Sequence, residues 1–388
     1  MNIRQLGTLF GCLFLIGSAE VVAGPMMAFM GAHFGVPSGT IAYLPAAYGL
    51  SYGGIALLAG PLSDRWGRKR LLQWSLLGFA LLCGLMPAAT HLTMAVVLAA
   101  LTGLCAAIIQ PNALSLVADL SAPEQVGRHI GHVFIGLMLA FVLTPALAGQ
   151  VAAHGGWAWP YWGLSALAMV ALCAVSVAFA PDTPDASAHA CNEAQSPTFW
   201  GTHRLALSTP GVRWRLSASY LWLGWVAGFG AVVAEVVARH LPDSPAQAGL
   251  LAGFFGVMVM LGNLCGSALQ QWMGRTALPA MAMVSAFGVW LFALPLDSPW
   301  LMAIAGIPWA LGYGCAGPLH HARLSALSGR YRGTINSYHA SLLNLGIFSV
   351  SALMGLMASS PSLTVFCGTV GWVALVGSAL LWQRGPQS

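Results

Sequence analysis

Long apolar stretches follow one another through the whole chain, and each is close to the length that crosses a lipid bilayer. A membrane-spanning helix needs about 20 mostly apolar residues. Twelve such stretches begin near Leu6, Thr40, Leu71, Leu92, Gly131, Trp157, Trp214, Gly249, Ala277, Trp300, Thr334 and Leu363. Charged residues make up 6% of the chain and hydrophobic residues 58%, against about 25% and 45–50% in soluble domains. The sequence therefore predicts an all-α integral membrane protein.

The basic residues indicate how the helices cross the membrane. With twelve crossings, fourteen of the fifteen lysines and arginines fall on one side, and only Arg239 falls on the other. Because Lys and Arg accumulate in cytoplasmic loops, we expect a multi-pass protein of the cell inner (plasma) membrane with both termini in the cytoplasm. An odd number of helices would scatter the basic residues over both sides. The net charge of +5 reflects this bias, so we expect no nucleic-acid partner.

The longest polar stretch divides the chain into two related halves. Residues 181–213 carry several acids, prolines and serines without helical periodicity, so we interpret them as a flexible cytoplasmic linker. They separate an N-terminal six-helix bundle, residues 1–180, from a C-terminal six-helix bundle, residues 214–388. The string Ala-Glu-Val-Val-Ala occurs at 19–23 and again at 234–238, which favours an internal duplication.

A compact charged turn lies between the second and third apolar stretches. It reads Gly-Pro-Leu-Ser-Asp-Arg-Trp-Gly-Arg-Lys-Arg over residues 60–70. A purely topological role accounts for its basic residues but not for its glycines or its aspartate. The turn resembles the loop signature of the major facilitator superfamily, G-x-L-x-D-R-x-G-R-K, at Gly60, Leu62, Asp64, Arg65, Gly67, Arg68 and Lys69.

This resemblance implies a fold and a mechanism. Members of the superfamily have twelve transmembrane helices in two pseudo-symmetric six-helix bundles, and they carry solutes by alternating access to a central cavity. In the family the acid of the loop interacts with the amino end of the eleventh helix and with nearby arginines, which locks the cytoplasmic gate. The gating residues implied for this chain are Gly60, Asp64, Arg65, Gly67 and Arg68.

Two acids, Glu20 and Glu235, lie well inside apolar stretches. A charged residue at a helix centre costs about 2.5–3.5 kcal/mol, so such acids are candidates for a function. Burial favours the protonated form of a carboxyl, which suits it to take up and release protons, and we predict that both acids couple transport to protons. The alternatives are structural. Glu20 can be held neutral by a hydrogen bond to a neighbouring helix, and Glu235 can pair with Arg239 at i,i+4.

The first apolar stretch carries a further resemblance. Residues 17–25, Gly-Ser-Ala-Glu-Val-Val-Ala-Gly-Pro, are similar to the opening helix of the drug and sugar-efflux branch. In that branch an acid precedes a glycine–proline step and is implicated in proton coupling and cation recognition, and it corresponds to Glu20. The antiporter signature of the fifth helix is kept in part, at Ala140, Thr144, Pro145, Ala148 and Gly149.

Several aromatic and polar side chains are candidates for lining a solute cavity. They are Tyr48, Tyr52, His132, Trp222, Trp225, His339 and Asn344. Core packing or interface anchoring is the alternative for the aromatic residues, and hydrogen bonding between helices is the alternative for the histidines. No Cys or His spacing indicates a metal site, and we expect no cofactor.

The sequence predicts a transporter rather than an enzyme, because no nucleophile, base and metal ligands cluster in it. We expect a monomer in the lipid bilayer that exports a small organic solute by alternating access, in exchange for protons. The alternative is a uniporter or an importer of a small metabolite that does not use protons.

Overall fold

The computed structural model describes residues 1–58, 66–122, 125–179, 199–241, 245–328, 331–359 and 362–382. These residues form helices and no strand. Ten segments within them are long and apolar enough to cross a membrane. One, Gln247–Leu291, holds two helices joined by a turn at Gly274–Thr276. With α3 (Tyr43–Ala56) counted as well, all twelve predicted helices are present, and each begins within a few residues of its predicted start.

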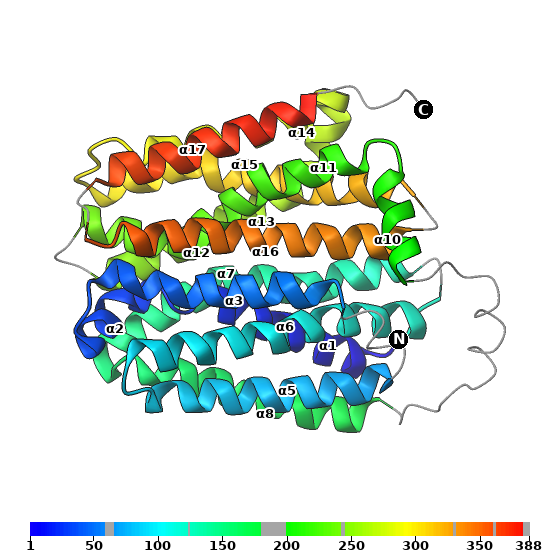
Figure 1. The fold of residues 1–388 in the computed structure, drawn as a ribbon, viewed down its shortest axis with the longest axis horizontal. Helices are drawn as coiled ribbons and strands as arrows, with labels where there is room; N and C mark the ends of the chain where they lie inside the picture. The colour runs from blue at the N-terminus through cyan, green and yellow to red at the C-terminus, as the bar shows by residue number, and fades with distance from the viewer. Residues whose placement is uncertain are drawn as a thin grey trace.

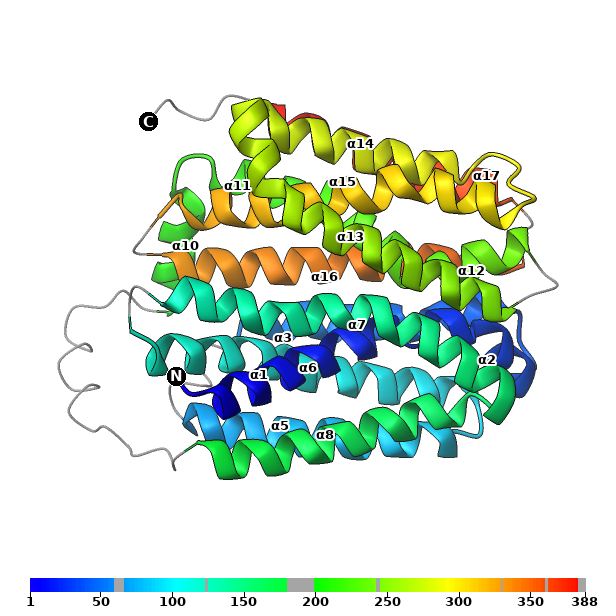
Figure 2. The same ribbon diagram turned by 180° about the vertical axis from the view of Figure 1, so that it is seen from behind.

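Six spans form the N-terminal bundle, drawn from blue to green in Figure 1. They are α1 (Ile3–Val21) continued by α2 (Met27–Phe34), α3, α5 (Arg68–Leu85), α6 (Leu92–Leu120), α7 (Val126–Gly155) and α8 (Ala158–Ala178). Six further spans form the C-terminal bundle. They are α11 (Val212–Ala218) continued by α12 (Trp225–His240), α13 (Pro245–Met273), α14 (Ala277–Leu291), α15 (Pro299–Ser325), α16 (Arg332–Leu356) and α17 (Leu363–Ala379). The two bundles lie side by side with their helices roughly parallel (Figures 1 and 2).

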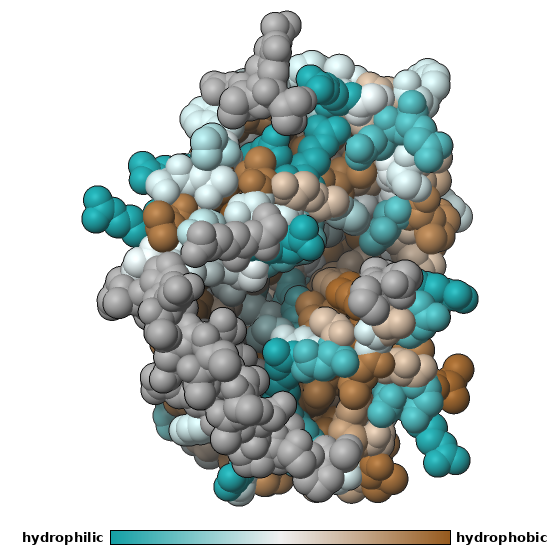
Figure 3. Space-filling view, turned by 90° about the vertical axis from the view of Figure 1, so that its right-hand side faces the viewer, coloured by the Kyte–Doolittle hydropathy of each residue, from teal (hydrophilic) through white to brown (hydrophobic). Residues whose placement is uncertain are grey.

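The two ends of the molecule differ in charge. We name the end that holds the start of α1 and the helix α10 (Phe199–Ser208) the linker side, and the end that holds α2 the far side (Figure 1). The described Lys and Arg residues lie at the linker side, except Arg239 in the last turn of α12. Hydrophilic side chains gather on the linker side around a hollow near its middle (Figure 3). The distribution agrees with the predicted grouping of basic residues on one side.

The prediction of an irregular linker is wrong for residues 199–208. These residues form α10, which lies across the linker side at a steep angle to the spans (Figure 1). Ala206 is fully buried there, in an apolar cluster that includes Leu216 and Ile335. The apolar and polar residues of this segment lie on different faces of the helix, and the apolar face packs on the C-terminal bundle. Residues 181–198 of the predicted linker lie outside the described residues.

Two pairs of helices join the bundles, α3 with α16 and α7 with α13. Glycines allow their backbones to approach closely. A Cβ added to Gly53 would lie 2.8 Å from the carbonyl oxygen of Ser341, and one added to Gly249 would lie 2.6 Å from that of Pro145. The hydroxyl of Ser341 also donates a hydrogen bond of 2.6 Å to the carbonyl of Gly53. Packing of small residues and hydrogen bonds between helices drive association in lipid, so the contact fits a membrane setting.

Candidate functional site

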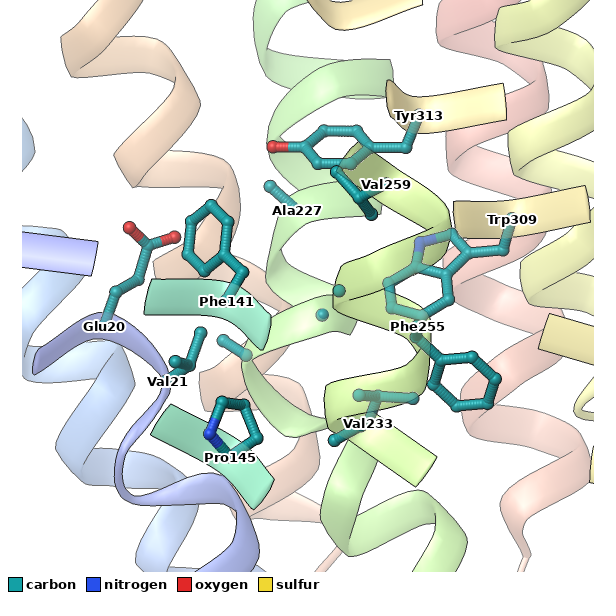
Figure 4. A pocket seen from close by; sticks show the side chains of 14 residues that line it. Glu20, Val21, Phe141, Pro145, Ala227, Val233, Phe255, Val259, Trp309 and Tyr313 are labelled. Atoms are coloured by element: carbon teal, nitrogen blue, oxygen red, sulfur yellow. The ribbon is translucent and has the colours of Figure 1, made fainter. Parts of the chain in front are cut away.

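A pocket lies between the two bundles, and Glu20 is the one acid among the described residues that line it (Figure 4). Residues of α1 and α7 line it from the N-terminal bundle, and residues of α12, α13 and α15 from the C-terminal bundle. The empty space is about 490 Å³, including the part open to solvent. A site shared by both bundles is where a transporter built from two related halves binds its solute.

The local structure of the first span places Glu20 at this pocket. Glu20 lies in the last turn of α1, and the chain then passes through a short 3-10 turn at Gly24–Met26 before α2 begins. Pro25 has no backbone N–H, so it cannot bond to the carbonyl of Val21 as a continuous helix requires. The first span is therefore interrupted about one turn after the acid.

The carboxyl of Glu20 has no hydrogen bond or ion pair with any described residue, and its side chain is partly exposed. Three tyrosine hydroxyls, those of Tyr48, Tyr52 and Tyr313, are close enough to interact with it electrostatically. In Figure 4 the hydroxyl of Tyr313 points toward the side of the pocket on which Glu20 lies. The alternative role, a carboxyl held by a neighbouring helix, has no support among these contacts.

Aromatic rings form the wall of the pocket opposite Glu20 (Figure 4). Trp309 and Phe255 meet edge to face with their centroids 5.5 Å apart, and Phe229 packs on Trp309 from behind at 5.1 Å. The indole N–H of Trp309 donates to the carbonyl of Val226, 3.3 Å away. Edge-to-face packing and this hydrogen bond fix the rings. On the other wall, Phe141 of α7 lies beside Glu20 (Figure 4).

The second intramembrane acid, Glu235, lies in a polar cluster at the far side. Its side chain is 1% exposed, and its Oε1 is 2.9 Å from Nε of Arg239. The hydroxyl of Ser38, which belongs to the N-terminal bundle, donates to the same oxygen over 2.6 Å. The i,i+4 pair anticipated from the sequence is therefore formed, and a hydrogen bond from the opposite bundle is added to it. We name Ser38, Glu235 and Arg239 the far-side latch.

Small residues also pack closely toward the far side. A Cβ added to Gly149 would lie 3.3 Å from the Cα of Gly249 and 3.4 Å from the Cβ of Pro25, and one added to Gly24 would lie 3.1 Å from the carbonyl oxygen of Ala231. The contacts of Gly149 with Gly249 and of Gly24 with Ala231 cross from one bundle to the other. Together with the far-side latch they join the two bundles at the far side.

Tyr48 and Tyr52 of α3 lie inside the N-terminal bundle and make defined hydrogen bonds. The hydroxyl of Tyr48 donates to the carbonyl of Ile16 at 3.3 Å, and that of Tyr52 donates to Oε1 of Gln110 at 2.7 Å. Tyr48 lines a second, smaller cavity, of about 350 Å³ including space open to solvent. Neither residue lines the pocket of Glu20, although both lie near the carboxyl.

The structure does not bring the other cavity candidates into the pocket. Trp222 is fully buried, and its Nε1 donates to Oγ of Ser285 at 2.9 Å. Trp225 packs partly buried against the core, and His132 is exposed on α7. The amide of Asn344 donates to the carbonyl of its own helix at Ala340 over 3.0 Å. None of the four is among the residues that line the pocket.

His339 belongs to a polar cluster inside the C-terminal bundle, near the linker side. Its Nδ1 is 2.9 Å from Oγ of Ser219, which is also 2.8 Å from Nε2 of His320. Ser219 opens the π-helical turn between α11 and α12, and His321 packs on His339 with ring centroids 4.9 Å apart. The cluster links three helices by hydrogen bonds, which is the alternative role anticipated for the histidine. No group of three His, Cys, Asp or Glu residues in the described chain is arranged to hold a metal ion.

The charged turn is described only at its end. Of the predicted gating residues, Gly60, Asp64 and Arg65 lie outside the described residues. Gly67 caps the start of α5 with φ of 84°, a conformation that favours glycine. Arg68 forms an ion pair with Asp119 at the end of α6, and it also donates to the carbonyl of Ser115 at 3.1 Å.

The sequence model of the Major Facilitator Superfamily matches residues 9–242. An uncharacterized MFS-type transporter, YceJ, of Bacillus subtilis (strain 168) is 26% identical over 370 residues, which cover 92% of this chain and 90% of that protein. A multidrug resistance protein B homolog of Mycobacterium tuberculosis (strain CDC 1551 / Oshkosh) is 27% identical over 156 residues, 40% of this chain and 29% of that protein.

Solved structures share the fold at low sequence identity. A D-xylose-proton symporter superposes with a TM-score of 0.79 at 16% identity, covering 99% of this chain and 97% of the symporter. The family match, the twelve-helix architecture and the similar transporters agree with one another and point to transport rather than to enzymatic activity. The chain is a member of the Major Facilitator Superfamily of membrane transporters.

Proposed function

We propose that this transporter exports a small amphipathic organic solute in exchange for protons, and that Glu20 binds both in turn. The observation that carries the proposal is the position of Glu20, an acid without a partner among the described residues, in a pocket shared by the two bundles. The linker side would face the cytoplasm, because basic residues accumulate there.

A single carboxyl can exchange a proton for a cationic solute. In a low-dielectric pocket the protonated form of Glu20 is favoured when no cation is near, whereas an opposite charge within about 4–6 Å favours the ionised form. Binding of a cationic group therefore releases the proton, and proton binding weakens the hold on the solute. This mutual exclusion is what an antiporter needs.

The remainder of the pocket favours an amphipathic solute. Its lining is aromatic and aliphatic apart from Glu20 and the hydroxyl of Tyr313. Aromatic faces attract cations as well as apolar groups, by about 0.5–2 kcal/mol per favourable contact. The similarity of one segment to a multidrug resistance protein B homolog agrees with a solute of this kind. We therefore propose an organic cation with an apolar or aromatic body.

The far-side latch and the small residues next to it would form the outer gate. With that gate closed, the pocket would load from the cytoplasm, and the gate would have to open for release. Glu235, held by Arg239 and Ser38, is the proposed gate acid, and its role in proton coupling would be indirect. When the far side is open, the turn with Gly60, Asp64 and Arg65 would close the linker side of the pocket.

Proton entry can supply the work. Exchange of one proton for one monovalent organic cation moves no net charge, so the pH difference across the membrane supplies the driving force. One pH unit corresponds to about 1.4 kcal/mol, which would support a concentration ratio of about tenfold.

Everted membrane vesicles with an imposed proton gradient and a fluorescent pH reporter test this proposal. A panel of organic cations and neutral amphipathic compounds is added to vesicles with the wild-type protein or with Glu20→Gln. We expect one class of solute to collapse the gradient in wild type and not in Glu20→Gln. Asp297→Asn is the matched control, because Asp297 is an exposed acid between α14 and α15.

Two outcomes would contradict the proposal. If wild type and Glu20→Gln respond alike, Glu20 does not carry the proton. If labelled solute crosses while the gradient stays intact in both, the protein is a uniporter or an importer without proton coupling.

A further inference from the structure

The two halves of the chain balance their charges differently. From residue 199 onward there are nine arginines and only three acids, Glu235, Asp243 and Asp297. Of the two that are described, Glu235 lies in α12 near its far-side end and Asp297 lies between α14 and α15, so no described acid of this half accompanies the arginines at the linker side. In the N-terminal half, by contrast, Arg68 pairs with Asp119. Among the described residues, the linker side of the C-terminal bundle therefore carries arginines without an acid of the same bundle beside them.

Three of these arginines form a connected row. Nη1 of Arg215 donates to the carbonyl of Arg323 at 2.9 Å. Arg323 donates in turn to the carbonyls of Arg275 and Gly274, at 3.3 and 3.5 Å. The charges of Arg215 and Arg275 are close enough to act on Arg323 electrostatically. We name Arg215, Arg275 and Arg323 the arginine row.

The hydrogen bonds of Arg215 and Arg323 leave most of the donors of the arginine row unused. Each guanidinium has five N–H donors; Arg215 uses one of them and Arg323 uses two in the bonds to carbonyls, and the Arg275 side chain makes none of these bonds. None of the three arginines has an ion pair with a described residue. Capping of carbonyls at the ends of α13 and α15 accounts for some of the contacts. Capping does not explain why three positive charges lie close together. Three neighbouring guanidinium groups favour the binding of an anion with several oxygens.

Exposed tryptophans lie near two members of the arginine row in the sequence. Arg275 is in the turn between α13 and α14, at the edge of the C-terminal bundle that is farthest from the N-terminal bundle (Figure 2). Tryptophans mark the membrane–water interface in membrane proteins. Trp272 is 82% exposed one turn before Arg275, and Trp214 is adjacent to Arg215 in the sequence and exposed. The arginine row therefore faces the bilayer at its interface rather than the pocket of Glu20.

We propose that the arginine row binds the phosphate headgroup of an anionic phospholipid in the leaflet at the linker side. Guanidinium groups recognise phosphate oxygens through paired hydrogen bonds, and basic pockets between transmembrane helices bind anionic headgroups. The site is separate from the solute pocket and does not depend on what the protein transports.

Native mass spectrometry of the purified full-length protein tests the site. The protein is held in detergent micelles that contain equal amounts of phosphatidylglycerol and phosphatidylcholine of the same chain length. We expect preferential binding of phosphatidylglycerol by wild type, and roughly fivefold weaker binding in Arg275→Gln. Arg275 is exposed, and its side chain makes none of the bonds that hold the row, so the variant keeps the fold. Arg275→Lys should restore most of the binding.

A matched control removes one charge elsewhere on the same side. Arg204→Gln changes an exposed arginine of α10 and should leave phosphatidylglycerol binding unchanged. Equal loss in Arg204→Gln and Arg275→Gln would overturn the proposal, since it would show diffuse attraction by net charge. Unchanged binding in Arg275→Gln would also overturn it. Competition by millimolar inorganic phosphate would assign the row to a soluble anion and would overturn the lipid assignment.

Discussion

The far-side latch allows one quantitative prediction, for the replacement Ser38→Ala. The hydroxyl of Ser38 donates to Oε1 of Glu235 over 2.6 Å, and it is the described side chain that joins this acid to the opposite bundle. A hydrogen bond to a charged group contributes about 1.5–3 kcal/mol. Because Glu235 keeps its pair with Arg239 at 2.9 Å, the variant should lose only the contact between bundles.

The expected shift follows from that free energy. A loss of about 1.5–3 kcal/mol changes the ratio of far-open to far-closed molecules about 13- to 160-fold. A minor state of about 1% in wild type, within the usual range of minor populations, would rise to about 11–62%. Even the lower limit is large enough to measure by spectroscopy.

Distances between spin labels measure this population. One label is attached at Ala153→Cys, at the exposed far end of α7, and the other at Trp300→Cys, at the start of α15, where the native side chain is 80% exposed. The background lacks the eight native cysteines. Ser38→Ala should add a population with a longer distance between labels. Ser217→Ala is the control, because that hydroxyl bonds at 3.1 Å within its own helix. If Ser38→Ala and Ser217→Ala both match wild type, the latch does not hold the far side closed.

Three further variants test other parts of the structure. Gly249→Val adds a side chain at a position where even a Cβ would lie 2.6 Å from the carbonyl oxygen of Pro145. The far-open population should therefore rise and solute flux should fall. Unchanged flux would contradict the proposed closure. Gly224→Ala brings a methyl group to 2.8 Å from the carbonyl of Leu343 and should destabilise the protein by about 1–3 kcal/mol, measured as a lower thermal unfolding temperature. An unchanged temperature would count against tight packing of the π-helical turn Ser219–Gly224 on α16. Phe141→Ala removes one aromatic face beside Glu20 and should raise the half-maximal concentration of aromatic cations about two- to thirtyfold with no effect on solutes that bypass the pocket; an unaltered concentration would place the solute elsewhere.

The transmembrane helices could be predicted from the sequence because each must keep its backbone bonded internally and its surface apolar. That constraint acts on every residue of a span, so the predicted first residues of the twelve spanning helices lie within a few residues of the observed ones. Glu20 and Glu235 could be recognised for the same reason, because an acid within an apolar stretch raises the free energy of inserting the helix into the membrane. The duplicated string placed them in equivalent spans, but the structure gives one a pocket and the other an ion pair.

The rotation of each helix and its partners could not be predicted in the same way. When a span is apolar on all faces, its sequence does not show which face lines the pocket. The hydropathy pattern therefore does not distinguish four of the pocket-lining residues, Phe141, Phe255, Trp309 and Tyr313. Trp222 looks equally suited to a cavity, yet it is fully buried against α14. Ser38 is an ordinary serine whose partner is 197 residues away. These contacts depend on tertiary packing, which the hydropathy pattern leaves open.

The central claim, that proton and solute compete for Glu20, is tested most directly by proton release on binding. A solute identified in vesicles is added to purified protein in weakly buffered detergent solution with a pH indicator. Wild type should release up to one proton per solute bound, because the bound cation favours the ionised carboxyl, and Glu20→Gln should release none. Solute binding by wild type without proton release, or equal release by Glu20→Gln, would contradict the account.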